Sequence, residues 1–218
     1  MTERGMIFNA EMVRAILDGR KTQTRRIMAP QPADDIERGI FPDPEAIGWK
    51  SSLRHKHGST TAHFCPYGKP GDRIWVRETF CPVDDTQYGG EKWVDYRATP
   101  KFEASHPAGW DSAPNDAEAL KWRPSIHMPR WASRILLEIT GVRVERLNSI
   151  HDVDAMREGI QNLTACSHSD FGIPGVVNAQ HPVRAFQLLW ESIYGTDSWS
   201  TNPWVWVIEF KRVEGGAA

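Results

Sequence analysis

The fold is decided by one short polar stretch that follows a helical pattern: Gly19-Arg20-Lys21-Thr22-Gln23-Thr24-Arg25-Arg26. Apolar residues recur at helical spacing over residues 8–18, and Asn9 stands where an N-cap is expected. Gly19 stands where helices commonly end in a left-handed residue. The polar stretch is therefore expected to lie against a rigid helix.

Two arrangements of this stretch remain open. In a turn, three-residue spacing brings Lys21 and Thr24 together, whereas in a strand Thr24 and Arg26 share one face. Either arrangement gathers an amine, a hydroxyl and a guanidinium in a small volume, which suits an anionic or carbonyl-rich ligand. The alternative is a solvated basic face whose cations interact favourably with the C-terminal end of the helix dipole.

Composition limits the class of protein. The chain has 218 residues, of which 40% are hydrophobic, and its ten Trp indicate a folded domain. Its formal net charge of −2 excludes a strong global attraction to nucleic acid, so a polyanion site would have to be a local patch. No apolar run reaches the roughly 18 residues of a membrane span, and residues 1–5 lack a signal-peptide core. Three widely spaced cysteines fit a reducing compartment, so we expect a cytoplasmic protein.

Periodicity places the secondary structure along the chain. Residues 6–8 fit a short strand, and helices are expected at 152–158 and 182–194 with a loop over 162–180 between them. Gly141 predicts a bulge or bend. The longer predicted strands are residues 73–80, 92–98, 135–147 and 204–213.

Glu78 falls on the apolar face of the strand predicted over 73–80. A carboxylate there must be paired or functional, because an unpaired buried charge is too costly. One interpretation is a structural ion pair with an Arg such as Arg26, and the other is a role toward substrate.

Residues 122–134 contain two prolines, which prevent a continuous helix and leave residues 126–128 extended between them. Trp122 and Trp131 could offer stacking surface to a base, although core burial is the commoner role of Trp. His127 could transfer a proton or form a hydrogen bond, and a structural role is an equal alternative.

Metal binding is weighed and not expected. The spacing of His55, His57, His63 and Cys65 could form a zinc site, but loop histidines near one cysteine are more often incidental. A weaker pattern alternates over Cys166, His168 and Asp170. We predict neither a metal nor a cofactor.

The pattern G-x-K-x-x-T-x-R, at Gly19, Lys21, Thr24 and Arg26, resembles the signature of the ASCH domain, a branch of the PUA-like superfamily. Residues 71–78 and 122–134 are similar to further blocks of the longer ASCH proteins common in phages and prophages. The resemblance implies an α+β fold with a PUA-like small β-barrel and helices packed outside. It implies a single domain over 1–218, with loop-rich insertions at about 29–64 and 100–134.

The resemblance also implies a function. ASCH proteins bind RNA or act on modified nucleosides, and a small bacterial branch hydrolyses the amide of N4-acetylcytidine. Carried onto this chain, the catalytic group of that branch is Lys21, Thr24 and Glu78. Thr24 could attack or position water, Lys21 could act as a base if its pKa were lowered, and Glu78 could transfer the proton.

We therefore expect recognition of RNA or a modified nucleobase or nucleoside in this cleft, with hydrolysis of an N4-acylcytidine-type amide as an additional activity. The alternatives are a non-catalytic RNA or modified-base reader, a phage protein-interaction module that uses the insertions, and, less favoured, a ribonuclease. The residues expected to bind the ligand are Arg20, Arg25, Arg26, Arg77, Trp122, His127 and Arg130.

Overall fold

The computed structural model describes residues 1–32, 36–40, 50–55, 60–84, 86, 91–101, 121–165 and 168–213. Within residues 36–62 the description is of the backbone alone. Both α-helices and β-sheets are present, so the mixed α/β character is shown. In the described part of the chain, no helix has the length and apolar character needed to span a bilayer.

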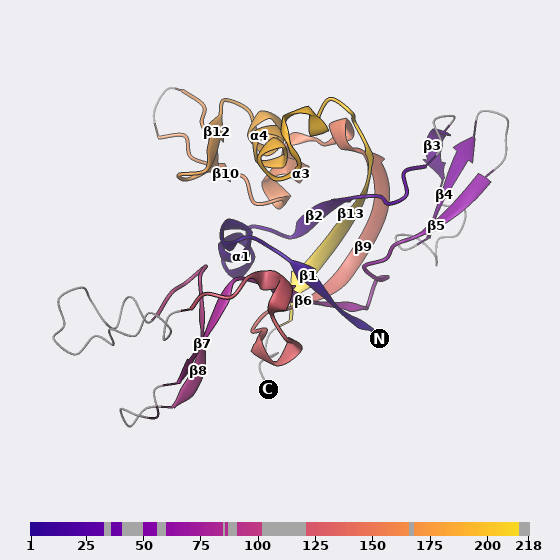
Figure 1. Cartoon of the computed structure of the whole chain (residues 1–218). Helices are drawn as coiled ribbons and strands as arrows, with labels where there is room; N and C mark the ends of the chain where they lie inside the picture. The colour runs from indigo at the N-terminus through magenta and orange to yellow at the C-terminus, as the bar shows by residue number, and fades with distance from the viewer. Residues whose placement is uncertain are drawn as a thin grey trace.

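A five-stranded sheet forms the centre of the molecule, and Figure 1 shows its strands curving across the middle of the fold. The outer strand β1 runs parallel to β6, and the other neighbours pair antiparallel. In spatial order the strands are β1 (Glu3–Ile7), β6 (Arg73–Arg77), β9 (Leu136–Arg146), β13 (Trp204–Arg212) and β2 (Gln23–Ile27).

The helix predicted before the polar stretch is confirmed as α1 (Ala10–Leu17), which connects the two outer strands. The Asn9 side chain caps it by accepting a hydrogen bond of 2.8 Å from the backbone N–H of Met12. Gly19 has a φ of 74°, as expected of a helix C-terminus. The helix buries its apolar face in the main core, through Met12, Val13, Ala15 and Ile16.

The two outer strands do not pair with each other among the described residues, so the central sheet is open in its backbone pairing. The closed barrel expected from the resemblance is therefore not confirmed. A side chain connects the edges instead, because Arg26 of β2 donates a hydrogen bond to the carbonyl of Ile7 in β1.

The longest strands, β9 and β13, agree with the prediction within one residue at each end, and their pairing contains the predicted bulge. Gly141 pairs with Glu209, whereas the next pair joins Ile139 with Phe210, so Thr140 is the extra residue. Buried residues of these strands form much of the main core.

The two later helices are confirmed as α3 (Asp152–Arg157) and α4 (Pro182–Tyr194). The loop predicted between them was wrong in part, because it contains a small antiparallel sheet. Its strands have two or three residues, too short to show periodicity in a sequence. They are β10 (Gln161–Asn162), β11 (Phe171–Ile173) and β12 (Val177–Ala179).

The strand predicted over 73–80 is divided at residues 78–79, and Phe80 begins β7 (Phe80–Asp84). This strand pairs antiparallel with β8 (Lys92–Tyr96). The extended conformation predicted for residues 126–128 was wrong, because Ser125–His127 and Arg130–Ala132 form 3-10 turns. Pro124 and Pro129 immediately precede these turns, and the fixed φ of proline suits such positions.

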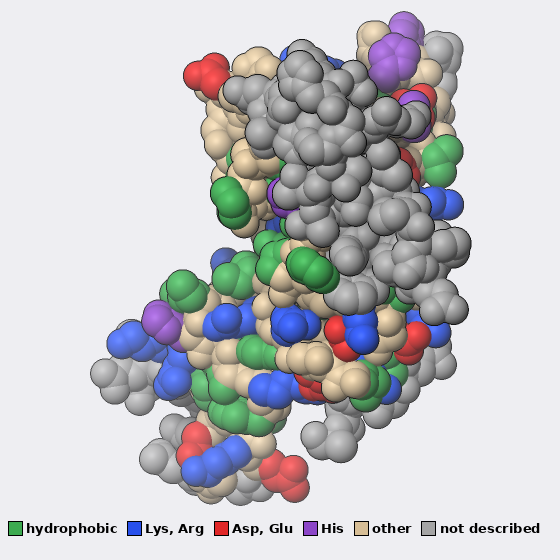
Figure 2. All heavy atoms as spheres, turned by 90° about the vertical axis from the view of Figure 1, so that its right-hand side faces the viewer, with side chains coloured by type: hydrophobic (Ala, Val, Ile, Leu, Met, Phe, Trp, Pro, Cys, Tyr) green, Lys and Arg blue, Asp and Glu red, His purple; other side chains and the backbone are tan. Residues whose placement is uncertain are grey.

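The first insertion contains a three-stranded antiparallel sheet, which Figure 1 shows to one side of the central sheet. Its strands are β3 (Ile36–Ile40), β4 (Lys50–His55) and β5 (Thr60–Phe64). Figure 2 looks onto this side of the molecule. Lys and Arg side chains gather there with Asp and Glu side chains among them, so this face has mixed charge.

Candidate functional site

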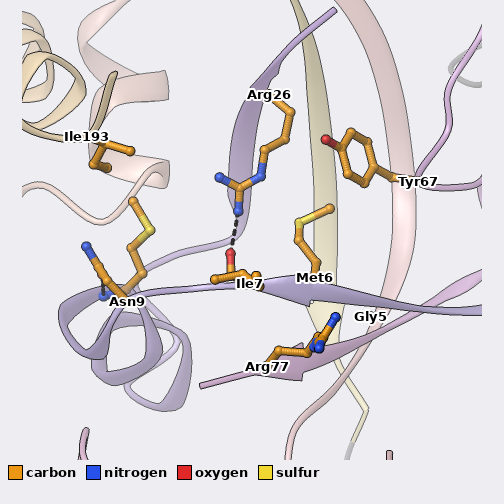
Figure 3. Close-up of a pocket in the computed structure, with 9 residues that line it drawn as sticks. Gly5, Met6, Ile7, Asn9, Arg26, Tyr67, Arg77 and Ile193 are labelled. Carbon is orange, nitrogen blue, oxygen red and sulfur yellow. Dashed lines mark hydrogen bonds between the residues drawn. The ribbon is translucent and has the colours of Figure 1, made fainter. Parts of the chain in front are cut away.

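An open pocket of about 430 Å³ lies between β1, the start of α1, β2 and the end of α4. Figure 3 shows its lining residues converging on one space from these separate elements. The lining residues are Gly5, Met6, Ile7, Asn9, Met12, Arg26, Tyr67, Arg77 and Ile193. We call this space the main pocket.

Arg26 comes from the polar motif and sits half-buried in the wall of the main pocket. Its guanidinium donates a hydrogen bond of 2.7 Å to the Ile7 carbonyl and lies 5.3 Å from the centre of the Phe8 ring. Strand alternation places Thr24 on the same face of β2 as Arg26. The sequence left open a turn that joins Lys21 to Thr24 and a strand in which Thr24 and Arg26 share a face. Thr24 and Arg26 lie in a strand.

Arg77 is the second cation of the main pocket. Its guanidinium lies 5.4 Å from the centre of the Trp75 ring and donates hydrogen bonds to the backbone carbonyls of Ser125 and Ile126. Gly5 makes this packing possible, because a Cβ there would lie 2.6 Å from Trp75 and 2.9 Å from Arg77. The second insertion is thereby attached to the pocket wall.

Tyr67 and Asn9 complete the polar lining. Burial raises the pKa of the Tyr67 phenol, with Arg26 lowering it and Tyr194 raising it, so these side chains share one environment. Figure 3 shows the Tyr67 hydroxyl directed toward the interior of the site. Asn9 uses its carbonyl oxygen for the helix cap, which leaves its amide N–H groups as donors.

The electrostatic character of the main pocket is therefore cationic and donor-rich. Arg26 and Arg77 are the charged residues of its described lining, and none of the described lining residues carries a carboxylate. Met6, Met12 and Ile193 provide apolar surface between them. This combination suits a flat ring that carries carbonyl or anionic groups.

A second, small cavity of about 10 Å³ adjoins the main pocket, because Met12, Arg26 and Ile193 line both spaces. This volume corresponds to about one water molecule. The small cavity is lined further by Thr24, Arg25, Glu158, Phe186, Leu189, Trp190 and Tyr194.

Lys21 lies behind the small cavity and is fully buried. Its ammonium donates to the Glu158 carboxylate at 2.7 Å and to the Glu158 backbone carbonyl at 2.8 Å. Burial lowers the pKa of Lys21, the Glu158 carboxylate opposes this shift, and Arg26 and Arg25 add to the lowering. The direction is the one that a general base requires.

Arg25 connects this ion pair to a wider charge network. Its guanidinium donates to Glu158 at 3.1 Å, Glu145 at 3.2 Å and Asp154 at 3.3 Å, so three carboxylates from β9 and from α3 with its C-cap converge on one buried cation. Arg143 extends the network by binding Glu145, Asp154 and Glu209. The network joins β2, β9, β13 and α3 behind the site.

Glu78 is buried and is held by Arg134, whose Nε and Nη2 each donate a hydrogen bond of 3.0 Å to one carboxylate oxygen. The ion-pair interpretation is confirmed, but the partner is Arg134, since Arg26 binds a backbone carbonyl. Burial raises the pKa of Glu78, and Arg134 opposes that shift.

The structure thus pairs Lys21 with Glu158, which lines the small cavity together with Thr24, and gives Glu78 a separate partner. Sequence reasoning missed Glu158. It lies 137 residues from Lys21 and follows α3 with no motif around it, so no sequence spacing indicated it.

The other predicted ligand-binding residues divide into two groups. Arg26 and Arg77 line the main pocket, and Arg25 lines the small cavity. The remaining four line neither space. Arg20 binds Asp18 and the Gly159 carbonyl, Trp122 lies beneath Arg97, His127 is exposed, and Arg130 pairs with Glu3.

The structure gives little support to the two metal sites considered from the sequence. In the ranges described above, no group of three or more His, Cys, Asp or Glu residues could hold a metal ion. His57, Cys166 and the side chain of His55 lie outside the described residues. Cys65 is buried, which raises the pKa of its thiol to about 11 and disfavours the thiolate that zinc binds.

Comparison with known proteins found no family model, no curated protein and no solved structure that matches this chain.

Proposed function

We propose that the main pocket binds a nucleobase, either within RNA or as a modified nucleoside. The observation that carries the proposal is that Arg26 and Arg77 both line an apolar-walled pocket of about 430 Å³, in which no described lining residue carries a carboxylate. A flat base packs against Met6 and Met12, while the arginines and Asn9 face its carbonyl groups or a phosphate.

We also propose that this chain is a member of the ASCH family, and the evidence again comes from the residues around the main pocket. The motif arginine spans the two outer strands of the central sheet, and the motif helix lies beside the main pocket. We propose that the curved sheet corresponds to a PUA-like barrel of the ASCH type, with the ligand between the sheet edges and α1.

Hydrolysis of an N4-acylcytidine-type amide is the second candidate function, and a separate observation favours it. Thr24 and Glu158 line the small cavity, and Lys21, with its lowered pKa, hydrogen-bonds Glu158. In the proposed step, water or the Thr24 hydroxyl attacks the amide carbonyl and gives up its proton to the Lys21–Glu158 pair. The C–N bond then breaks, and the amine leaves with that proton. Where Thr24 is the nucleophile, the acyl group is left on it as an ester, which a water molecule then hydrolyses to release the carboxylic acid and restore the hydroxyl.

Calorimetric titration with a panel of nucleosides and short RNA oligonucleotides tests binding. We expect Arg26→Met and Arg77→Met to weaken binding at least tenfold. Arg20→Met is the matched control, because Arg20 lines neither space, and it should leave affinity within twofold. Equal affinity in the wild type and both pocket variants would exclude this pocket as the binding site.

An assay with N4-acetylcytidine separates the enzyme from the reader. Turnover that is lost in Lys21→Ala and Glu158→Gln preparations shown by circular dichroism to be folded, and retained in Arg20→Met, would support hydrolysis. Binding without turnover in a folded wild type would assign the chain as a reader. An affinity for RNA that falls steeply with salt would then indicate phosphate contacts.

A further inference from the structure

The two 3-10 turns of the second insertion lie against the outward face of β1 and β6. Arg77 of β6 donates hydrogen bonds to the backbone carbonyls of Ser125 and Ile126. Arg130 of the second turn donates a hydrogen bond of 3.0 Å to the Glu3 carboxylate of β1. The turns are therefore attached to both strands, and Figure 1 shows this part of the chain beside them.

This outward face is continuous with the main pocket. Gly5, Ile7 and Arg77 belong to the face by strand alternation and also line the pocket. Glu3, where Arg130 is attached, precedes Gly5 by two residues, which is roughly 7 Å along an extended strand. A ligand that extends beyond the pocket over this face would reach the turns next.

The turns expose two large apolar side chains. Trp131 is 71% exposed and Ile126 is 60% exposed. The other tryptophans whose burial the structure describes are buried or half-buried, so the exposure of Trp131 is exceptional in this chain. Exposed aromatic rings near cations are the surfaces on which proteins stack the bases of single strands.

The charge of this segment suits a polyanion. Residues 121–137 contain no Asp or Glu, and their exposed Lys and Arg residues are Lys121, Arg123 and Arg130. Glu3 contacts two cations, Arg130 at 3.0 Å and Arg73 at 3.9 Å, so positive charge exceeds negative charge at this contact. Charge complementarity therefore favours a nucleic-acid strand as the occupant.

We propose that the outward face of β1 and β6, together with residues 125–131, binds the nucleotide that neighbours the pocket-bound one in a single RNA strand. The flanking base stacks on Trp131, and the exposed cations of the segment contact phosphates. We call this area the flanking surface. This inference rests on the proposed function and narrows its ligand to a nucleotide within a strand.

Oligonucleotides that differ only in the flanking base test the flanking surface in the wild type. Each strand carries the nucleobase that binds best in the titration panel and, on one side, either a purine nucleotide or an abasic nucleotide. The two strands have the same phosphates, so their affinity ratio measures the contribution of the flanking base. We expect the abasic strand to bind at least fivefold more weakly when the change is made on one side, 5′ or 3′.

The variant test uses Trp131→Ala. The preference for the strand with the flanking base should fall to within twofold, while affinity for the abasic strand stays within twofold of the wild type. Trp131→Phe keeps an aromatic ring and should retain most of the preference. Val153→Ala is the control, because Val153 is 63% exposed on α3 and lines neither the main pocket nor the small cavity. Its preference should equal that of the wild type.

The outcomes separate the two proposals. No binding of any nucleoside or oligonucleotide would overturn the proposed function itself. Equal affinity for the two strands, or an unchanged preference in Trp131→Ala shown by circular dichroism to be folded, would overturn the flanking surface and leave the main pocket as the binding site. Sedimentation with phosphatidylserine vesicles that Trp131→Ala abolishes, without any preference for the flanking base, would assign the exposed ring to a membrane and overturn the inference.

Discussion

Nη2 of Arg26 lies 2.7 Å from the backbone carbonyl oxygen of Ile7, and this hydrogen bond joins the two outer strands of the central sheet at the main pocket. The same guanidinium supplies half of the positive charge that lines the pocket. Arg26 therefore connects the two outer strands of the sheet and is also one of the two arginines that we propose to contact the ligand.

The Arg26→Met variant should lose both contributions. We expect the free energy of unfolding to fall by about 1 kcal/mol, because a hydrogen bond to a half-exposed charged group is removed. Urea denaturation measures this loss, and Arg212→Met, at an exposed position at the end of β13, should change stability by less than about 0.5 kcal/mol. An unchanged stability of Arg26→Met would show that this contact does not hold the strands together.

The Gly5→Ala variant should distort the main pocket from its edge. The added Cβ would lie 2.6 Å from the Trp75 ring, so the ring and Arg77 must shift. We expect a loss of about 1–3 kcal/mol in unfolding free energy and weaker nucleoside binding. Arg4→Ala on the same strand is the control, because the Arg4 side chain is exposed and its contact with Asp72 is long, at 3.8 Å.

The Glu158→Gln variant should be strongly destabilised. It weakens the pairing of two buried cations, Lys21 and Arg25, and such losses cost about 3–5 kcal/mol. Thermal and urea denaturation should show it clearly. Glu138→Gln removes a surface pair with Lys211 and should cost under about 1 kcal/mol, so similar losses in both variants would refute a special role for the buried network.

Glu78 should produce a measurable dependence of stability on pH. Its pKa is raised in the folded state, so between its ordinary value of 4.5 and the raised value the folded protein binds more protons than the unfolded chain. Its contribution to unfolding free energy therefore falls as pH rises through this interval and is constant above it. The difference in stability between the wild type and Glu78→Gln, measured by urea denaturation from pH 4 to 8, should follow that course. A difference that rises with pH would contradict it.

Cys65 should resist alkylation in the native protein. Its pKa of about 11 leaves about one thiolate in a thousand at pH 8, and the side chain is buried. Iodoacetamide labelling, followed by peptide mass spectrometry, should detect slow modification of Cys65 in buffer and rapid modification in urea. Rapid labelling in buffer would show that this region opens readily.

Local signals in the sequence predicted the local structure well. Asn9 and Gly19 bound the first helix because capping depends on residues within a single turn. The strands β9 and β13 were predicted because they are long and apolar, and Gly141 marks their bulge. The turns at residues 125–132 and the short strands β10–β12 escaped prediction because segments of two or three residues carry no period.

The site was less accessible to sequence reasoning because its partners are distant along the chain. Burial of Glu78 followed from its place on an apolar face, but Arg134 is 56 residues away, and spacing could not select it among many arginines. Lys21 and Glu158 are separated still further. Such pairs are set by the topology of the sheet, which brings β2, β9 and the end of α3 together.

The attachment of Arg77 to the carbonyls of Ser125 and Ile126 has a consequence for how this site could diversify. An arginine in the pocket wall is thus held by a segment, residues 122–134, that supplies none of the described lining residues of the main pocket. Altering the length or prolines of residues 122–134 would therefore rotate a recognition group while every lining residue stayed the same. Ligand preference could thus evolve without a change in any residue that lines the pocket.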